Sequence, residues 1–284
     1  MGYALGMCTN YSGSTGDVGP KLEKIAAAGF THVLWGDHAW HDYLYTDPEI
    51  EYAARCLERT GLKVNDLHCP TGKDQRWGSG VEHERLAGVE SLKNRIRMAS
   101  RLGCDVIVCH TPTEPEDAAE RTAYWDRQRR TLEALRELAG RSGVRLAMEN
   151  TLPGNFDTLE RFLEIGGAEL VGVCYDSGHG NAKVDWPGNG LERFERIKSR
   201  VIDLHLHDND GTGDLHWMLF RGTTDWARLA TLAVGSGYRK TVVPLEVVLE
   251  QSGLSDETAF LRQAAEVARR LAGLFDAAAQ GKAR

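Results

Sequence analysis

The chain has 284 residues, 42% of them apolar, which is enough to bury one sizeable core. Thirty-four lysines and arginines against forty-one aspartates and glutamates give a net charge of −7, which disfavours nucleic acid as a partner. The six cysteines form no C-x-x-C pair, no basic-then-apolar leader is present, and no apolar run approaches the roughly 20 residues of a membrane-spanning helix. We therefore expect a reduced, cytoplasmic protein that does not enter a membrane.

Short apolar runs alternate eight times with longer amphipathic segments, among them 18–29, 84–103, 120–140 and 256–275. Eight such units predict an α/β fold, a single (β/α)₈ TIM barrel over residues 1–284, with a frayed tail at 277–284. An open doubly wound sheet typically has a G-x-G-x-x-G turn after an early strand, and no such motif follows a predicted strand in this sequence. The predicted strands are Tyr3–Cys8, Thr31–Trp35, Lys63–His68, Asp105–His110, Val144–Glu149, Leu170–Asp176, Val201–His207 and Thr241–Glu246.

Polar side chains gather at the carboxyl ends of these strands, which is where such barrels build their chemistry. Six of the eight predicted strands end in a histidine or a carboxylate, and three more such groups follow in the next loops. Several carboxylates in one mouth of low dielectric would repel one another, and a divalent cation removes that cost. The sequence therefore predicts a metal site that draws on His68, His110, Glu149, Asp176, His179, His207, Asp214, His216 and Glu246.

The stretch 203-DLHLHDNDGTGDLHW-217 begins as a strand and ends as a loop. His205 and His207 are two residues apart, so both would point to the same side of the strand, with His207 nearer the mouth. We therefore expect His205 to lie a layer deeper, in the core or behind the ligands. The turn residues that follow are expected to bring Asp214 and His216 back over the site.

These residues resemble the xylose-isomerase-like TIM barrel superfamily, which includes sugar isomerases, ketose 3-epimerases and endonuclease IV (AP endonuclease family 2). The pieces that carry the resemblance are 147-AMEN-150, 173-VCYDSGHGN-181, 205-HLHDNDGTGDLHW-217 and 243-VPLEV-247. The resemblance implies that His179 contacts a sugar and that one divalent metal is held by Glu149, Asp176, His207 and Glu246. With the four remaining groups these residues look like the nine-ligand set of the three-zinc cluster of endonuclease IV, which implies one to three ions. The chain departs from the ketose 3-epimerases at Gly213 and Asp214, where those enzymes carry an arginine.

Aromatic residues are dense in the loops expected on the same face. Aromatic faces beside polar groups suit a sugar ring, suit stacked bases equally, and could also simply cover the barrel. The candidate substrate-binding residues are Trp35, His38, Trp40, Trp77, Trp217 and Arg221.

The leading functional hypothesis is a divalent-metal-dependent isomerase or epimerase acting on a carbohydrate or polyol. Glu149 and Glu246 would move a proton on opposite faces of the substrate, and His179 would hold a hydroxyl. A dehydratase acting on a keto-sugar is a near variant. The alternative is a zinc phosphodiesterase acting on abasic DNA, which the ligand count favours and the net charge disfavours. The ligand types admit Zn, Mn, Co or Fe, and the sequence leaves a homo-oligomer open.

Overall fold

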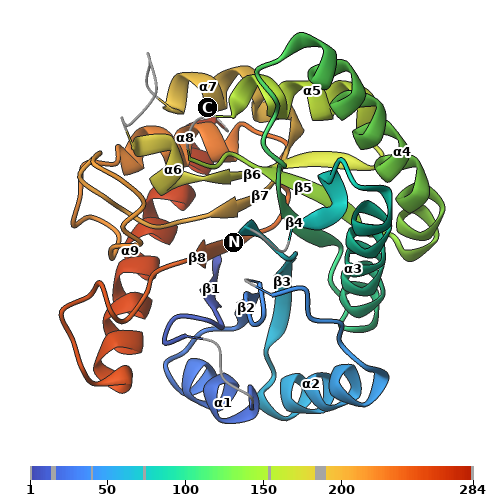
Figure 1. Ribbon diagram of the computed structural model, residues 1–284. Helices are drawn as coiled ribbons and strands as arrows, with labels where there is room; N and C mark the ends of the chain where they lie inside the picture. The colour runs from blue at the N-terminus through green and yellow to red at the C-terminus, as the bar shows by residue number, and fades with distance from the viewer. Residues whose placement is uncertain are drawn as a thin grey trace.

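Eight parallel strands form the centre of the molecule (Figure 1). The computed structural model describes residues 2–13, 17–39, 41–72, 75–152, 155–182 and 190–282. The strands follow the order β7-β6-β5-β4-β3-β2-β1-β8, and a bridge between Leu206 and Leu245 joins the two ends of this order. The sheet is thereby a nearly closed barrel, so the predicted single (β/α)₈ TIM barrel is confirmed. The strands are β1 Ala4–Cys8, β2 His32–Trp35, β3 Lys63–His68, β4 Val106–His110, β5 Arg145–Glu149, β6 Val171–Asp176, β7 Val201–His205 and β8 Val242–Leu245.

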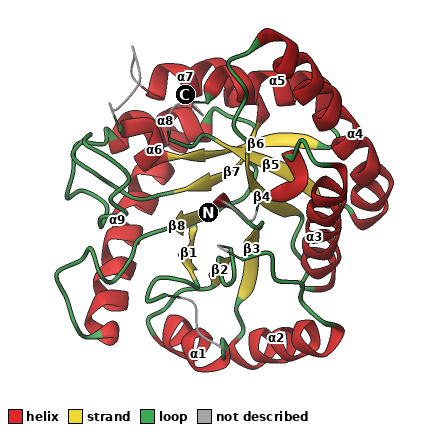
Figure 2. Ribbon diagram, in the orientation of Figure 1, coloured by secondary structure: helices red, strands yellow, loops and turns green. Residues whose placement is uncertain are grey.

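Helices surround the strands on the outside of the barrel (Figure 2). Local signals in the sequence set several of their ends. A capping box of Thr46 and Glu49 begins α2, and the Asp117 carboxylate begins α4 by accepting two backbone N–H groups. Gly61 and Gly143 end these helices at φ 72° and 65°, where glycine avoids the strain of a side chain. The helices are α1 Gly19–Ala27, α2 Asp47–Thr60, α3 Glu82–Arg101, α4 Ala118–Ser142, α5 Phe156–Gly166, α6 Ser177–Asn181, α7 Gly190–Ile197, α8 Trp226–Val234 and α9 Glu257–Lys282, with short 3₁₀ turns η2 Arg76–Gly78 and η3 Lys198–Arg200.

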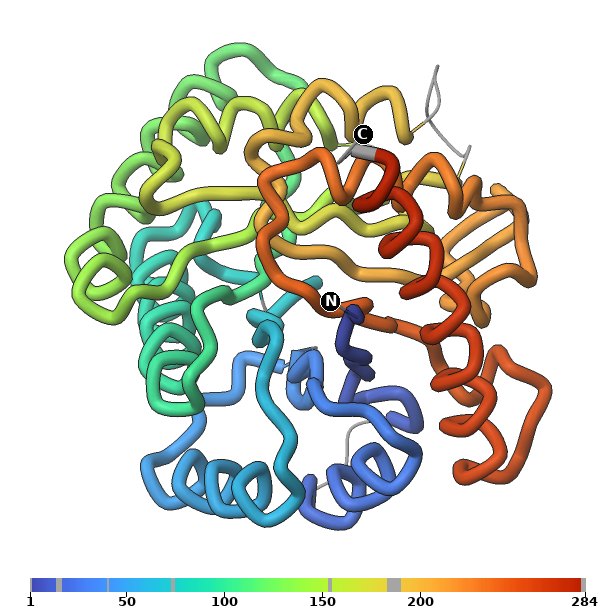
Figure 3. The backbone as a smooth tube through the Cα atoms, turned by 180° about the vertical axis from the view of Figure 1, so that it is seen from behind, coloured from blue at the N-terminus to red at the C-terminus, as the bar shows by residue number. Residues whose placement is uncertain are grey.

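The last helix, α9, packs beside α8 and against β1 and β8, as the red segment of Figure 3 shows. It continues through residues 277–282, which were expected to fray. Three alanines at 277–279 are strong helix formers, and the buried Phe275 anchors the preceding turn in the core. In the part of the chain that the structure describes, no helix is both long enough and apolar enough to cross a membrane.

Two strands end earlier than the sequence predicted, and this changes what stands at the mouth of the barrel. β7 ends at His205 rather than at residue 207, and β8 ends at Leu245. The register between β6 and β7 shifts at Val173/Cys174, which places His205 directly opposite Asp176. His205 is therefore a strand-end residue at the mouth.

Candidate metal centre and active site

The carboxyl ends of the strands enclose a cavity of about 530 Å³. Predicted ligands from four strand ends and from the loop after β7 line it. Residues that the sequence did not single out also line it, from the segment after β1 and the segment after β8. The described lining consists of Asn10, Tyr11, Ser12, Gly13, Ala39, His68, Thr71, His110, Glu149, His179, Asp214, His216, Glu246, Val248, Leu249 and Glu250.

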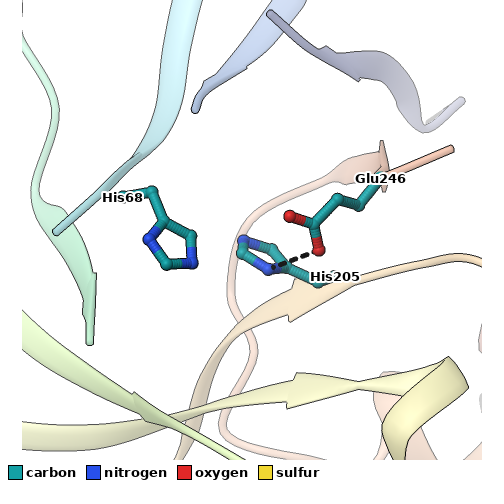
Figure 4. A group of neighbouring side chains, drawn as sticks. All are labelled: His68, His205 and Glu246. Carbon is teal, nitrogen blue, oxygen red and sulfur yellow. Dashed lines mark ion pairs between the residues drawn. The ribbon is translucent and has the colours of Figure 1, made fainter. Parts of the chain in front are cut away.

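One group of four side chains lies at the centre of the mouth. Glu149, Asp176, His205 and Glu246 each offer one ligand atom, and these atoms all lie within 4.8 Å of one another. The Nδ1 atom of His205 is 3.0 Å from Glu246 Oε2 and 3.6 Å from Glu149 Oε1. Figure 4 shows His205 and Glu246 facing each other, with His68 on the other side. Three carboxylates and one imidazole of this arrangement are a donor set for a divalent cation.

His205, not His207, completes this central group, which makes His205 a candidate ligand where the sequence predicted a residue behind the ligands. Its side chain is 1% exposed, and it reaches Glu149 and Glu246 because β7 ends there. His207 instead lies with its Nε2 atom 3.1 Å from Asp176 Oδ1, and its ring stacks on that of His216 with centroids 4.0 Å apart. His207 therefore remains a candidate ligand, on the outer side of Asp176.

A second group shares Glu149. Its Oε2 atom is 3.5 Å from His68 Nε2 and 3.2 Å from His110 Nε2. The other nitrogen of each ring is engaged, because His68 Nδ1 lies 2.8 Å from the Cys69 carbonyl and His110 Nδ1 lies 2.6 Å from the Thr71 hydroxyl. These bonds aim both Nε2 atoms at the carboxylate.

A third group forms where the loop after β7 folds back over the barrel. Asp214 lies 3.1 Å from His216 Nε2, and His207 completes this group. Asp214 also lies 3.2 Å from His179 Nε2. The buried Asp208 carboxylate clamps this loop, since it accepts hydrogen bonds from the backbone N–H groups of residues 222 and 224 and from the Trp226 indole. The turn chemistry predicted after the seventh strand thus brings residues 214 and 216 to the site.

The backbone of His216 lies in the left-handed region, at φ 44°. That conformation is strained for a side-chain-bearing residue and persists only where the surroundings fix it. Its Nδ1 atom is 2.7 Å from the Glu246 carbonyl, and its own carbonyl accepts from Val248 N–H at 3.2 Å. The end of β8 thereby fixes the direction of the His216 ring.

The protonation chemistry of the site fits a bound cation. A neutral imidazole carries one N–H, and the Nδ1–H groups of His68 and His216 donate to backbone carbonyls. Their bare Nε2 atoms then face carboxylate oxygens of Glu149 and Asp214. Two lone-pair-bearing atoms at this distance require a cation between them, either a proton or a metal.

Several buried atoms of the site also lack a hydrogen-bond partner among the described residues, although buried polar groups ordinarily have one. All of them are nitrogen or carboxylate oxygen atoms, which are the donors that a transition metal uses. They are Glu149 Oε2, Asp176 Oδ2, His179 Nδ1, His205 Nδ1 and both ring nitrogens of His207.

The ionisable groups of the site shift one another's pKa values strongly. Burial alone would raise the pKa of Glu246, but the adjacent His205 lowers that pKa to about 2. Burial would likewise lower the pKa of His216, yet the Asp214 carboxylate raises it to about 9. Burial also opposes the charge of Glu149, whose pKa nevertheless lies well below its usual value because His110 and His205 face it. In the metal-free protein, protons on the imidazoles therefore balance the carboxylates.

The aromatic residues predicted to bind substrate lie mostly elsewhere. Trp35 is buried and donates to the Tyr45 hydroxyl at 3.0 Å, and His38 stacks on Tyr43. Trp77 is 2% exposed and packs edge-on against Phe162, between the helices rather than at the mouth. None of these three is among the described residues that line the cavity. The side chains of Trp35 and Trp77 turn into the core, whereas His38 is half-buried beside Tyr43, and its contact with a substrate stays a prediction.

Trp217 and Arg221 lie on the loop after β7, with the guanidinium 4.6 Å from the centre of the indole ring. Neither is among the described residues of the cavity lining. Trp40 lies outside the described residues.

The sequence reasoning missed the contribution of the segment after β1. Asn10 and Tyr11 line the cavity, and the Tyr11 ring is buried and stacks on Phe260. The signal was available, because 9-TNYSG-13 is a polar stretch directly after the first strand.

The fold and the site define a class of protein, the (β/α)₈ barrels that carry a histidine and carboxylate cluster at the carboxyl-terminal mouth. Residues 22–271 match the sequence profile of the xylose isomerase-like TIM barrel family, so the chain belongs to that family.

Relatives by sequence include two uncharacterized proteins and a group of nucleases. The chain is 28% identical over 276 residues to protein y4fM of Sinorhizobium fredii, covering 88% of this chain and 87% of the relative. It is 26% identical over 200 residues to a probable endonuclease 4 of Mycobacterium ulcerans, covering 63% of this chain and 75% of the relative.

Solved structures with the same fold include a D-tagatose 3-epimerase-like protein, at 22% identity and a TM-score of 0.74, covering 99% of this chain and 100% of the other. They also include 3-keto-D-glucoside 4-epimerase from E. coli, at 18% identity and a TM-score of 0.72, covering 94% and 99%. These likenesses confirm the fold.

Proposed function

We propose that the protein is a divalent-metal-dependent isomerase or epimerase that acts on a small carbohydrate, with dehydration of a keto-sugar as a near variant. The observation that carries the proposal is the pairing of Glu149 and Glu246 across the mouth. Glu149 ends β5 and Glu246 directly follows β8, and β6 and β7 separate these strands, yet both carboxylates reach the same nitrogen of His205. Both also line the cavity.

Two carboxylates that approach one cavity from different strands can serve opposite faces of a bound substrate. Epimerisation needs this, because a proton leaves one face of a carbon and another returns from the opposite face. A divalent ion held by the central group would polarise a substrate carbonyl and acidify the neighbouring C–H bond. Glu149 is 1% exposed, so water is excluded around it, whereas Glu246 is 14% exposed and open to the cavity.

In this proposal, His179 holds a substrate hydroxyl. Its ring is buried at the edge of the cavity, with Nδ1 3.4 Å from Glu149 Oε1 and Nε2 3.2 Å from Asp214 Oδ2. The described lining contains no lysine or arginine, so it offers no ammonium or guanidinium group to a phosphate. This favours an uncharged sugar as the substrate. The names of the structural neighbours, D-tagatose 3-epimerase-like protein and L-ribulose 3-epimerase, agree with that class.

A second function, hydrolysis of a phosphodiester at abasic DNA, is supported by the two outer groups of ligands and by the similarity to probable endonuclease 4 proteins. The absence of lysine and arginine from the described lining counts against it.

The test is to incubate the metal-loaded protein with free ketopentoses, free ketohexoses and 3-keto-glycosides, and separately with an oligonucleotide that contains an abasic site. We expect epimerised sugar and intact oligonucleotide. Cleaved oligonucleotide with unchanged sugars would replace the first function by the second.

A further inference from the structure

A column of buried polar side chains lies in the barrel beneath the central group. Asp66 of β3 and Asp203 of β7 are 1% and 0% exposed. Asn65 joins them, because its Nδ2 atom donates to Asp66 Oδ2 at 2.9 Å and to Asp203 Oδ1 at 3.0 Å. The interior of such a barrel is ordinarily filled by branched apolar side chains, and burying two carboxylates costs free energy. The free-energy cost of these two buried carboxylates therefore calls for a functional explanation.

The lower end of the column is closed by Lys240, whose Nζ atom donates to Asp203 Oδ2 at 2.8 Å. The same ammonium lies 3.4 Å from Asp105 and also donates to the backbone carbonyl of residue 65. Lys240 therefore compensates the charge of Asp203. No such cation reaches Asp66, whose nearest ionisable partner among the described ion pairs is a histidine.

That histidine is His205, and its two ring nitrogens face different partners. Nε2 lies 3.5 Å from Asp66 Oδ1, on the side of the column. Nδ1 lies 3.0 Å from Glu246 Oε2, on the side of the cavity. His205 thus joins the buried column to the central group, and Figure 4 shows its ring facing Glu246 on the side of the cavity.

We propose that Asp66 is a positioning residue that fixes the tautomer and the direction of the His205 ring, so that Nδ1 is presented as a metal ligand beside Glu149 and Glu246. The inference rests on the metal dependence in the proposed function. An ionised carboxylate accepts hydrogen bonds only, so Asp66 holds the single proton of a neutral His205 on Nε2. The lone pair of Nδ1 is then free for an ion, and the carboxylate behind the ring raises its basicity. Asn65 orients the Asp66 carboxylate by donating to its Oδ2 atom at 2.9 Å.

The test compares Asp66→Asn with Asp203→Asn. Both changes are isosteric and both remove one buried carboxylate of the same column, but only the first touches His205. Zn²⁺ affinity of the metal-stripped proteins is measured by competition with a chelator, and the ring nitrogens of His205 are observed by ¹⁵N NMR after zinc loading. Thermal unfolding of the metal-free proteins reports the effect on the fold.

We expect Asp66→Asn to weaken zinc binding about 10- to 100-fold and to give mixed ligation through both ring nitrogens. Asp203→Asn should leave zinc affinity and Nδ1 ligation unchanged while lowering thermal stability, because it removes the nearest carboxylate from the half-buried Lys240. Equal losses of affinity in both variants, unchanged affinity in Asp66→Asn, or Nε2 ligation in the wild type would each overturn the inference. If Asp66→Asn does not fold, Asp66→Ser replaces it, with the same expected loss.

These readouts separate the inference from the proposed function. A wild type that binds zinc through Nδ1 but epimerises no sugar leaves the role of Asp66 intact. A wild type that binds no divalent ion contradicts both.

Discussion

Replacing Glu149 by glutamine should damage the site far more than the same change at Glu246. Glu149 and Glu246 each belong to the central group and to one further group that contains His68, but the two carboxylates differ in how many imidazoles they face. The oxygens of Glu149 face four imidazole nitrogens at 3.2 to 3.6 Å, whereas Glu246 forms one such ion pair, at 3.0 Å. The amide keeps the size and an oxygen but loses the negative charge that those imidazoles share.

The magnitudes follow from this geometry. Removing one partner from a buried charged cluster costs about 3–5 kcal/mol, so the metal-free Glu149→Gln protein should unfold at a clearly lower temperature at pH 7. Glu246 is 14% exposed, and water can replace part of its role, so the loss there should be smaller. Losing a general base typically lowers turnover about 10²–10⁴-fold, which we expect in both variants.

The assay measures metal content by elemental analysis, thermal unfolding and sugar turnover on the wild type and both variants. Glu149→Gln should retain less metal than Glu246→Gln, since the Glu149 carboxylate faces four imidazole nitrogens and the Glu246 carboxylate faces one. Equal metal content and equal stability in the two variants would refute the reasoning that Glu149 is the shared ligand.

Three further outcomes are expected. His205→Ala should lose the ion of the central group while His207→Ala keeps it, which elemental analysis of the two proteins decides; the reverse result would restore the assignment made from sequence. The metal-free protein should lose stability as pH rises from about 6.5 to 9, because the pKa of His216 is raised to about 9 in the folded protein, above its value of about 6.5 in the unfolded chain. The stabilisation that protonated His216 gives is therefore complete below about pH 6.5 and gone above about pH 9. Metal-loaded protein, whose imidazoles are already deprotonated, should show no such loss in chemical denaturation, and a flat profile for the metal-free form would contradict the charge balance. Trp77→Ala should cost about 3–5 kcal/mol by leaving a cavity against Phe162, with unchanged metal content and KM; a raised KM would return this residue to the substrate site.

Much of this arrangement could be predicted, because a parallel barrel forces the carboxyl ends of all its strands to one mouth. Glu149, Asp176 and His110 follow from that rule alone and lie where it puts them. The choice between His205 and His207 could not be made in this way. It depends on where β7 ends and on the register shift between β6 and β7, and both are set by tertiary packing.

The direction of side chains in loops could not be predicted from the sequence either. Trp77 follows the third strand along the chain, as a residue at the mouth would. The 3₁₀ turn that carries Trp77 packs tightly on α3, so that a Cβ atom added at Gly88 would lie 2.2 Å from the backbone nitrogen of Trp77. This close approach sends the indole into the helical layer. Only the contacts of the folded chain determine such a direction.

The measurement that tests the central claim most directly is turnover in D₂O, followed by NMR, of the panel of free ketoses and 3-keto-glycosides by metal-loaded protein. Proton transfer by Glu149 and Glu246 beside a carbonyl predicts that solvent deuterium enters the carbon next to that carbonyl, and that metal-stripped protein incorporates none. Sugars that remain free of carbon-bound deuterium, together with cleavage of an abasic oligonucleotide by the same protein, would contradict the account.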